Sequence, residues 1–232
     1  WSRPKSMATR STKDGHGAST DVAVPQVTYE YLNPNHKETL PREWWNTSFQ
    51  MLPSDDILKQ MKSNDPTYTT LDASCRQLQG SRIEIIAEAC KDNTSITEVD
   101  LRGNGFDADG LYALVQALKT MPNVKKINLR ANTCRNQGVE ALAEYLKTNT
   151  KVEELNLNEN NLGSPGAVAM AGALKANKTL KVLDLSLNYI DDEGGKAIAD
   201  ALDANSTLQV LNMSGNEITD KALRVKCRSR KA

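Results

Sequence analysis

The sequence predicts an α/β solenoid, a stack of short parallel strands backed by helices, because one pattern of apolar residues returns every 28 residues. Between residues 96 and 218 the pattern apolar-x-x-apolar-x-apolar-x-x-Asn-x-apolar occurs five times without an inserted or deleted residue. Repetition at such a period is typical of folds in which each unit packs only against its neighbours. The matching positions are Ile96, Val99, Leu101, Asn104, Phe106; Val124, Ile127, Leu129, Asn132, Cys134; Val152, Leu155, Leu157, Asn160, Leu162; Leu180, Leu183, Leu185, Asn188, Ile190; and Leu208, Leu211, Met213, Asn216, Ile218.

The second half of each unit predicts a helix. A glycine follows the strand pattern in four units, and four residues later an apolar pair begins whose members are four positions apart, the spacing of one helix face. An asparagine follows three of these helices, and we expect it to take the left-handed conformation that ends many helices. The glycines are Gly110, Gly138, Gly166 and Gly194; the pairs begin at Leu114, Leu142, Met170 and Ile198; the asparagines are Asn149, Asn177 and Asn205.

The asparagine inside the strand pattern has a structural interpretation. It lies where the chain leaves the strand, so an inward side chain can bond backbone groups that have left the sheet ladder. Asparagines stacked from unit to unit would satisfy buried backbone along the whole stack. A binding function would not need the same residue in every unit, so we expect a structural ladder rather than a site.

The motif, its period and the return helix resemble the ribonuclease-inhibitor type of leucine-rich repeat over residues 54–223. The resemblance implies a curved solenoid of about five to six repeats, with parallel strands on the concave face and helices on the convex face. Curvature also follows from spacing, because strands lie about 4.8 Å apart and packed helices roughly 8 to 10 Å apart. Members of the class are protein-binding scaffolds, GTPase activators, immune sensors and cytoskeletal caps, so the motif leaves the partner open.

The start of the repeat domain predicts a capping helix. It begins at Ser54, whose hydroxyl can cap free N–H groups, and ends before Pro66. A degenerate first repeat follows, with Arg76 where asparagine is expected. The helix, residues 64–66 (Asn-Asp-Pro) and residues 71–72 (Leu-Asp) are together similar to the entry of the tropomodulin repeat domain. Residues 1–53 do not resemble the tropomyosin-binding helices of that family, so its actin-capping sites are not transferred.

Two extensions flank the predicted repeat domain. Residues 1–53 show no helical period, and we expect an extended, mostly irregular arm whose aromatic side chains anchor it to the first repeat or to another subunit. Residues 224–232 form a basic tail, which is either solvated or binds an acidic partner. The arm aromatics are Tyr29, Tyr31, Trp44, Trp45 and Phe49, and the tail cations are Arg224, Lys226, Arg228, Arg230 and Lys231.

The outward positions of the strands predict a protein-binding face, because side chains alternate between the two faces of a strand. Charge is concentrated in the first three complete units, where Arg102 and Arg130 would stack among acidic side chains, and later units carry small or apolar residues. A mixed-charge patch of this kind gives specificity to a protein interface; the alternative is a solvated sheet face. The candidate residues are Glu98, Asp100, Arg102, Lys126, Asn128, Arg130, Glu154, Asn156 and Asn158.

Composition narrows the function classes. The chain has 29 basic and 29 acidic residues, and this balance argues against a dedicated nucleic-acid binder. No apolar run reaches the roughly 18 residues of a membrane span. Both histidines lie in the arm, and the glycines belong to the repeat rather than to a nucleotide-binding loop, so no catalytic, cofactor or metal site is predicted. Among the cysteines we expect Cys75 in the first strand and Cys90 and Cys134 in the core.

We therefore expect a non-catalytic scaffold subunit of a larger assembly, without a small-molecule substrate. A cytoskeletal or ciliary setting with tubulin or axonemal partners is favoured, and the basic, hydroxyl-rich opening around Met7 leaves the mitochondrion as an alternative location. One alternative function is a GTPase activator of the Ran-activating type, in which Arg102 or Arg130 would stabilise transition-state charge. Another is a tropomodulin-like actin-binding protein.

Overall fold

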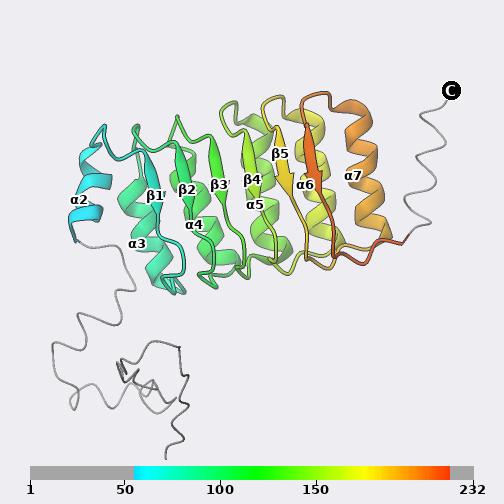
Figure 1. The fold of residues 1–232 in the computed structure, drawn as a ribbon, viewed down its shortest axis with the longest axis horizontal. Coiled ribbons are helices and arrows are strands. Elements are labelled where there is room, and N and C mark those ends of the chain that lie inside the picture. The colour runs from blue at the N-terminus through cyan, green and yellow to red at the C-terminus, as the bar shows by residue number, and fades with distance from the viewer. Residues whose placement is uncertain (1–54, 220–232) are drawn as a thin grey trace, which may run out of the picture. The chain divides into compact units, whose positions relative to one another are not determined.

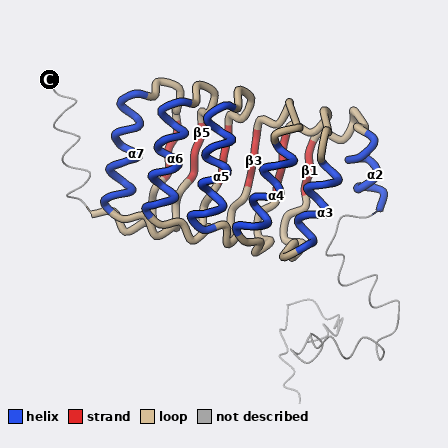
Figure 2. The backbone as a smooth tube through the Cα atoms, turned by 180° about the vertical axis from the view of Figure 1, so that it is seen from behind, coloured by secondary structure: helices blue, strands red, loops and turns tan. Residues whose placement is uncertain are grey.

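The computed structural model describes residues 55–219; the arm, Ser54 at the predicted start of the capping helix, residues 220–223 and the basic tail lie outside this range. Within it, six parallel strands form one open sheet in sequence order. Figure 1 shows the strands as one layer and the helices as a second layer behind them, and Figure 2 shows the helical layer from the other side. The predicted α/β solenoid is confirmed. The elements are α2 (Asp55–Ser63), β1 (Thr70–Asp72), α3 (Ser81–Cys90), β2 (Glu98–Asp100), α4 (Ala108–Leu118), β3 (Lys126–Asn128), α5 (Arg135–Thr148), β4 (Glu154–Asn156), α6 (Ser164–Ala176), β5 (Val182–Asp184), α7 (Asp192–Ala204) and β6 (Val210–Asn212).

The register of the sheet follows the 28-residue period. Val99 of β2 lies opposite Ile127 of β3, which in turn lies opposite Leu155 of β4. These three central side chains are buried against the helices, and the two residues that flank each of them face the open side. Because no unit is longer or shorter than its neighbour, equivalent residues stack in rows across the strands. The predicted strand phase is confirmed.

The core lies between the sheet and the helices, and a glycine near the start of α4, α5, α6 and α7 lets each of these helices pack closely against the residues around its start. A Cβ on Gly166 would lie 2.5 Å from Leu162 Cδ2, and one on Gly194 would lie 2.7 Å from Ile190 Cγ2. Ordinary carbon contacts need about 3.5 Å or more. The repeated glycine is therefore a packing requirement at the start of the helix.

The strand-end asparagines form the predicted ladder. Asn188 donates from Nδ2 to the carbonyls of Leu157 (2.9 Å) and Leu185 (3.0 Å), and its Oδ1 accepts from the backbone N–H groups of Asn160 and Leu162. One side chain thus joins two units through backbone groups that the sheet does not pair. Nδ2 bonds to a carbonyl of the preceding unit recur at Asn104, Asn132, Asn160 and Asn216.

One step of this ladder is incomplete. Asn160 donates to Leu129 O at 2.8 Å, but its buried Oδ1 has no hydrogen-bond partner among the described residues. The chain before α5 follows a different path: Cys134 is helical (φ −62°, ψ −29°) and Arg135 has a positive φ of 53°. As a result the Arg135 N–H donates to the main-chain carbonyl of Asn160 at 3.0 Å and not to its side-chain Oδ1.

The asparagines that follow the helices do not take the predicted left-handed conformation. Asn149, Asn177 and Asn205 are extended, with φ of −72°, −70° and −109°. Asn177 shows the reason: Nδ2 donates to Leu146 O (2.7 Å), and Oδ1 accepts from the N–H of Leu180 (2.7 Å). The side chain, rather than a backbone turn, ends the helix. These residues form a second asparagine ladder on the opposite edge of the stack.

Met121 interrupts the second ladder, and at the following step a tyrosine bridges Asn149 to the backbone of the preceding unit. Met121 is buried where the other units have asparagine. The Leu118 carbonyl, which a following asparagine would reach, instead accepts from the hydroxyl of Tyr145 at 3.4 Å, and Asn149 Nδ2 donates to that hydroxyl at 2.8 Å. Burial raises the pKa of Tyr145 to about 12.

The N-terminal end of the stack is closed by α2, as predicted. Met61 of this helix is 1% exposed, and its carbonyl accepts from Asn93 Nδ2 at 2.6 Å. The first repeat is in register, with Leu71 and Leu78 buried. The prediction for Cys75 is wrong: β1 ends at Asp72, and Cys75 lies exposed in the following turn with φ 55°.

Candidate functional site

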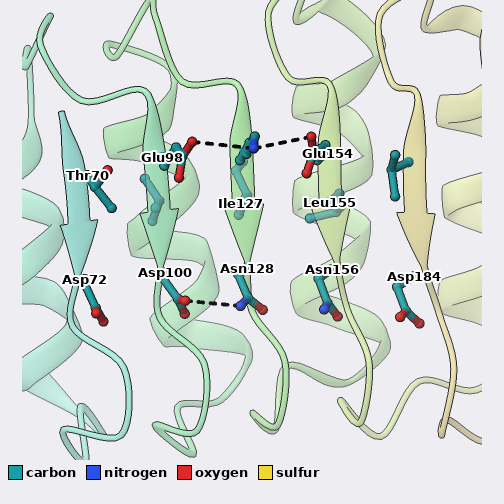
Figure 3. A pocket seen from close by; sticks show the side chains of 13 residues that line it. Thr70, Asp72, Glu98, Asp100, Ile127, Asn128, Glu154, Leu155, Asn156 and Asp184 are labelled. Carbon is teal, nitrogen blue, oxygen red and sulfur yellow. Dashed lines mark hydrogen bonds and ion pairs between the residues drawn. The ribbon is translucent and has the colours of Figure 1, made fainter.

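An open groove of about 370 Å³ runs across the outward face of β1 to β5 (Figure 3). Its floor includes Val99, Ile127 and Leu155, and its walls are two rows of side chains that the register stacks from strand to strand. We refer to these as the first and second rows of the concave groove. The first row is Thr70, Glu98, Lys126, Glu154 and Val182, and the second row is Asp72, Asp100, Asn128, Asn156 and Asp184.

The first row contains one cation between two anions. Lys126 Nζ lies 3.5 Å from Glu98 Oε1 and 3.5 Å from Glu154 Oε1, because the register places the three residues side by side. Both interactions are drawn in Figure 3. The Glu154 and Glu98 carboxylates raise the pKa of Lys126. The lysine therefore remains charged, and its charge is offset within the row.

The second row consists of carboxylates and amides. Asp100 Oδ2 lies 3.4 Å from Arg102 Nη1 and accepts from Asn128 Nδ2 at 3.3 Å. At the first strand, the hydroxyl and N–H of Ser74 bond Asp72 Oδ1 at 2.7 and 3.1 Å, and these bonds lower the pKa of Asp72.

Asp184 closes the second row at the other end. Its Oδ1 accepts from the N–H of Ser186 at 2.9 Å, and its Oδ2 accepts from Asn212 Nδ2 at 3.2 Å. Within the described residues Asp184 forms no ion pair, and its carboxylate accepts hydrogen bonds from uncharged donors only. The groove lining thus holds five carboxylates and one ammonium, a net charge of −4 that does not include the Arg102 guanidinium paired with Asp100, in a chain whose 29 basic and 29 acidic residues balance.

Arg102 and Arg130 do not form the predicted mixed-charge patch on the groove. Arg102 is paired with Asp100, and Arg130 is exposed and forms no ion pair with any of residues 55–219. Neither arginine lines the groove. Of the candidate residues, Glu98, Asp100, Lys126, Asn128, Glu154 and Asn156 do line it, so the charged face that the structure assembles is acidic rather than mixed.

Asn158 is a correction to the predicted open face. It is only 7% exposed, and its Nδ2 donates to the carbonyl (3.1 Å) and hydroxyl (2.6 Å) of Ser186. The chain turns directly after it, at Glu159 with φ 58°, so the alternation of a strand no longer applies. Asn158 is a structural residue that joins two units.

Two residues that line the groove were not among the candidates predicted from the sequence. Thr70 and Asp72 belong to the degenerate first repeat, which was not included in the candidate face, yet they stand in register with Glu98 and Asp100. Counting back 28 residues from the candidate face would have found both. The expectation of small or apolar residues on the later strands holds for Val182 and for Val210, which continues the first row on β6 and is 52% exposed, but not for Asp184, whose carboxylate lines the groove.

Other chemistry is limited in the described part of the chain. Residues 55–219 contain no group of three or more His, Cys, Asp or Glu side chains placed to hold a metal ion. Cys90 and Cys134 are buried as predicted, and burial raises the pKa of both thiols, that of Cys90 to about 12. None of the helices between residues 55 and 219 is long and apolar enough to cross a membrane. The aromatic residues of the arm and the cations of the tail lie outside this range.

Comparison with known proteins supports the repeat assignment. A model of the leucine-rich repeat family matches residues 92–115, 148–171, 176–199 and 204–225. The search of curated protein sequences found no match. Two solved structures are similar in fold. Leiomodin-1 actin-binding site 2 has a TM-score of 0.58 at 21% identity and covers 77% of this chain and 98% of its own. The tropomodulin C-terminal domain of Caenorhabditis elegans has a TM-score of 0.54 at 16% identity and covers 76% and 98%.

These likenesses confirm the predicted similarity to the tropomodulin repeat domain, and at such identities they show the fold alone. The family model reaches four of the units, and the parallel register of the sheet continues through all six strands. The described part of the chain is a leucine-rich-repeat solenoid.

Proposed function

We propose that the chain is a non-catalytic protein-interaction module whose docking surface is the concave groove. The observation that carries the proposal is the groove itself, which is open across five strands and lined by charged side chains that are about half exposed. A surface of five to six strands extends about 25 Å along the stack, which suits a helix or loop of another protein. Like-charge contacts disfavour wrong partners, so an acidic groove selects a basic segment.

We propose a cytoskeletal assembly as the setting. The support is the fold shared with a leiomodin region named as an actin-binding site, which makes actin filaments the first partner to test. Tubulin and other axonemal proteins are the partners proposed from the sequence, and they form the second arm of the test.

The test is co-sedimentation of the purified chain with actin filaments and, separately, with microtubules. Pelleting with either polymer supports a cytoskeletal role and assigns the partner, and pelleting with neither contradicts it. The double variant Glu98→Gln, Glu154→Gln removes two groove charges and should weaken pelleting at least several-fold. Glu140→Gln, on the exposed side of α5, is the matched control and should have no effect.

The same variants test the site separately from the partner. If the chain pellets and the groove variant binds as well as Glu140→Gln, another surface makes the contact. GTPase activation has one structural observation in its favour, the exposed and unpaired guanidinium of Arg130 within the described range. A GTP-hydrolysis assay with small GTPases and Arg130→Ala tests it, and the absence of stimulation by the wild type ends that alternative.

A further inference from the structure

We propose that the concave groove is occupied, in the partner-free protein, by the chain's own residues 221–231, which comprise most of the basic tail and the three residues before it. The tail then acts as an internal competitor that a docking partner must displace. The inference rests on the groove being a binding surface, as proposed above, but it does not depend on the identity of the partner.

Charge complementarity is the first argument. The groove lining has a net charge of −4, and Asp184 at its C-terminal end is bonded only by neutral donors within the described residues. Residues 221–231 contain six cations and no acidic residue. The tail therefore carries the charge that this face lacks, within a chain that is neutral as a whole.

Reach is the second argument. Thr219, the last described residue, is fastened at the start of α7: its N–H donates to Asp192 Oδ1 at 2.6 Å and its hydroxyl to Asp192 Oδ2 at 2.7 Å. Thr219, the residue from which the chain continues toward the tail, thus lies at the end of the stack next to β5 and β6. The ten steps from 221 to 231 span up to about 33 Å when extended. The strands that line the groove span only about 19 Å from β1 to β5.

The order of residues in the tail is the third argument. Arg224, Lys226, Arg228 and Arg230 alternate with small or apolar residues, so an extended chain would present all four cations on one side. The repeat-family match ends at residue 225, and a further repeat helix suits the rest of this stretch poorly. The period places Lys226 and Arg230 where α4 has Leu114 and Leu118, each 1% exposed, and unpaired cations are costly to bury.

Tethering makes such a contact effective even if it is weak. A short flexible linker gives the attached segment a local concentration of about millimolar. The contact is electrostatic and partly exposed, so salt should weaken it, because charges are screened within about 10 Å at 0.1 M salt. A basic partner segment with more contacts can then displace the tail.

The test is zero-length cross-linking of the purified full chain with a carbodiimide, which joins a lysine amine to a carboxylate. We expect the tail lysines, Lys221, Lys226 and Lys231, to link to Asp72, Glu98, Asp100, Glu154 and Asp184 at 50 mM NaCl. These links should fall at least fivefold at 500 mM NaCl. They should fall as far in the variant Arg224→Ser, Arg228→Ser, Arg230→Ser, which keeps all three lysines.

A control variant with the same change in net charge, Lys91→Ser, Lys175→Ser, Lys178→Ser, alters exposed lysines of the repeat domain and should leave the tail links unchanged. Mixing ¹⁵N-labelled and unlabelled protein identifies the copy involved. Links mainly between differently labelled copies would overturn the proposal in favour of a second copy as occupant. Tail links spread over helix carboxylates such as Glu140 would overturn groove binding altogether. No partner is present, so failure here is distinct from failure of the co-sedimentation test.

Discussion

The two faces of the sheet follow opposite rules. On the buried face, each unit repeats the same residue types, as Val99, Ile127 and Leu155 show, and the strand-end asparagine recurs in the same place. In the first row of the open face the stacked residues change from unit to unit, as in Glu98, Lys126 and Glu154, whereas the second row keeps Asp or Asn on every strand. A position that repeats identically serves the stack, because every unit makes the same contacts with its neighbours. A position that varies is available for recognition.

This difference predicts that stability and binding can be changed separately. The largest expected effect is on the buried face. Leu157→Ala removes a side chain that is 0% exposed, and we expect the free energy of unfolding to fall by about 2 to 5 kcal/mol. Leu187→Ala is the control, since Leu187 is 55% exposed in the following unit. Equal shifts of the urea midpoint for the two variants would contradict the buried arrangement.

The asparagine ladder offers a finer comparison between two buried positions. Asn188 uses both ends of its amide, whereas Asn160 Oδ1 has no partner among the described residues. Removing Asn188 leaves more backbone groups unpaired, so Asn188→Ala should cost about 3 kcal/mol and Asn160→Ala about 2 kcal/mol. Urea unfolding followed by circular dichroism measures both. A larger loss for Asn160→Ala would mean that the ladder is complete at that step in solution.

Asn158 tests where the open face ends. Its Nδ2 bonds join it to Ser186 across the unit boundary, so Asn158→Ala should lower the free energy of unfolding by about 1 kcal/mol. Asn156, two residues earlier and half-buried in the groove, is the matched control, and its replacement by alanine should cost less. Thermal unfolding of the two variants measures the difference in stability loss. A larger loss for Asn156→Ala than for Asn158→Ala would indicate that Asn158 lies on the open face.

The smallest effect on stability is expected for the charged side chains in the first row of the concave groove. Glu98 and Glu154 are about half exposed and share one lysine, and exposed ion pairs contribute little to folding. The double variant Glu98→Gln, Glu154→Gln should unfold at the wild-type temperature within error while it loses partner binding. A clear drop in melting temperature would show that the row supports the sheet and would weaken its assignment as a docking surface.

Sequence reasoning succeeded where a rule acts locally and repeats. Val99 and Leu114 were assigned to apolar strand and helix positions of the repeat, and Cys90 was assigned to the core; all three are buried. It failed where a side chain reaches into the next unit. Asn177 was expected to end its helix by a left-handed turn, but bonds to Leu146 and Leu180 hold it extended. No local pattern distinguishes these two ways to end a helix, because the partner carbonyl is 31 residues away.

In the candidate site, too, local rules predicted some residues correctly and failed for others. Six of its nine concave residues line the groove because strand alternation is local, while Asn158 is buried because the chain turns at Glu159. The 28-residue period by itself determined the fold, the strand phase and the face that points outward, since an uninterrupted period leaves one register. Only the tertiary structure decided that Arg102 is neutralised by Asp100 and that the groove is acidic. Those charges are balanced through distances between side chains, which depend on rotamers and loop paths that no sequence period specifies.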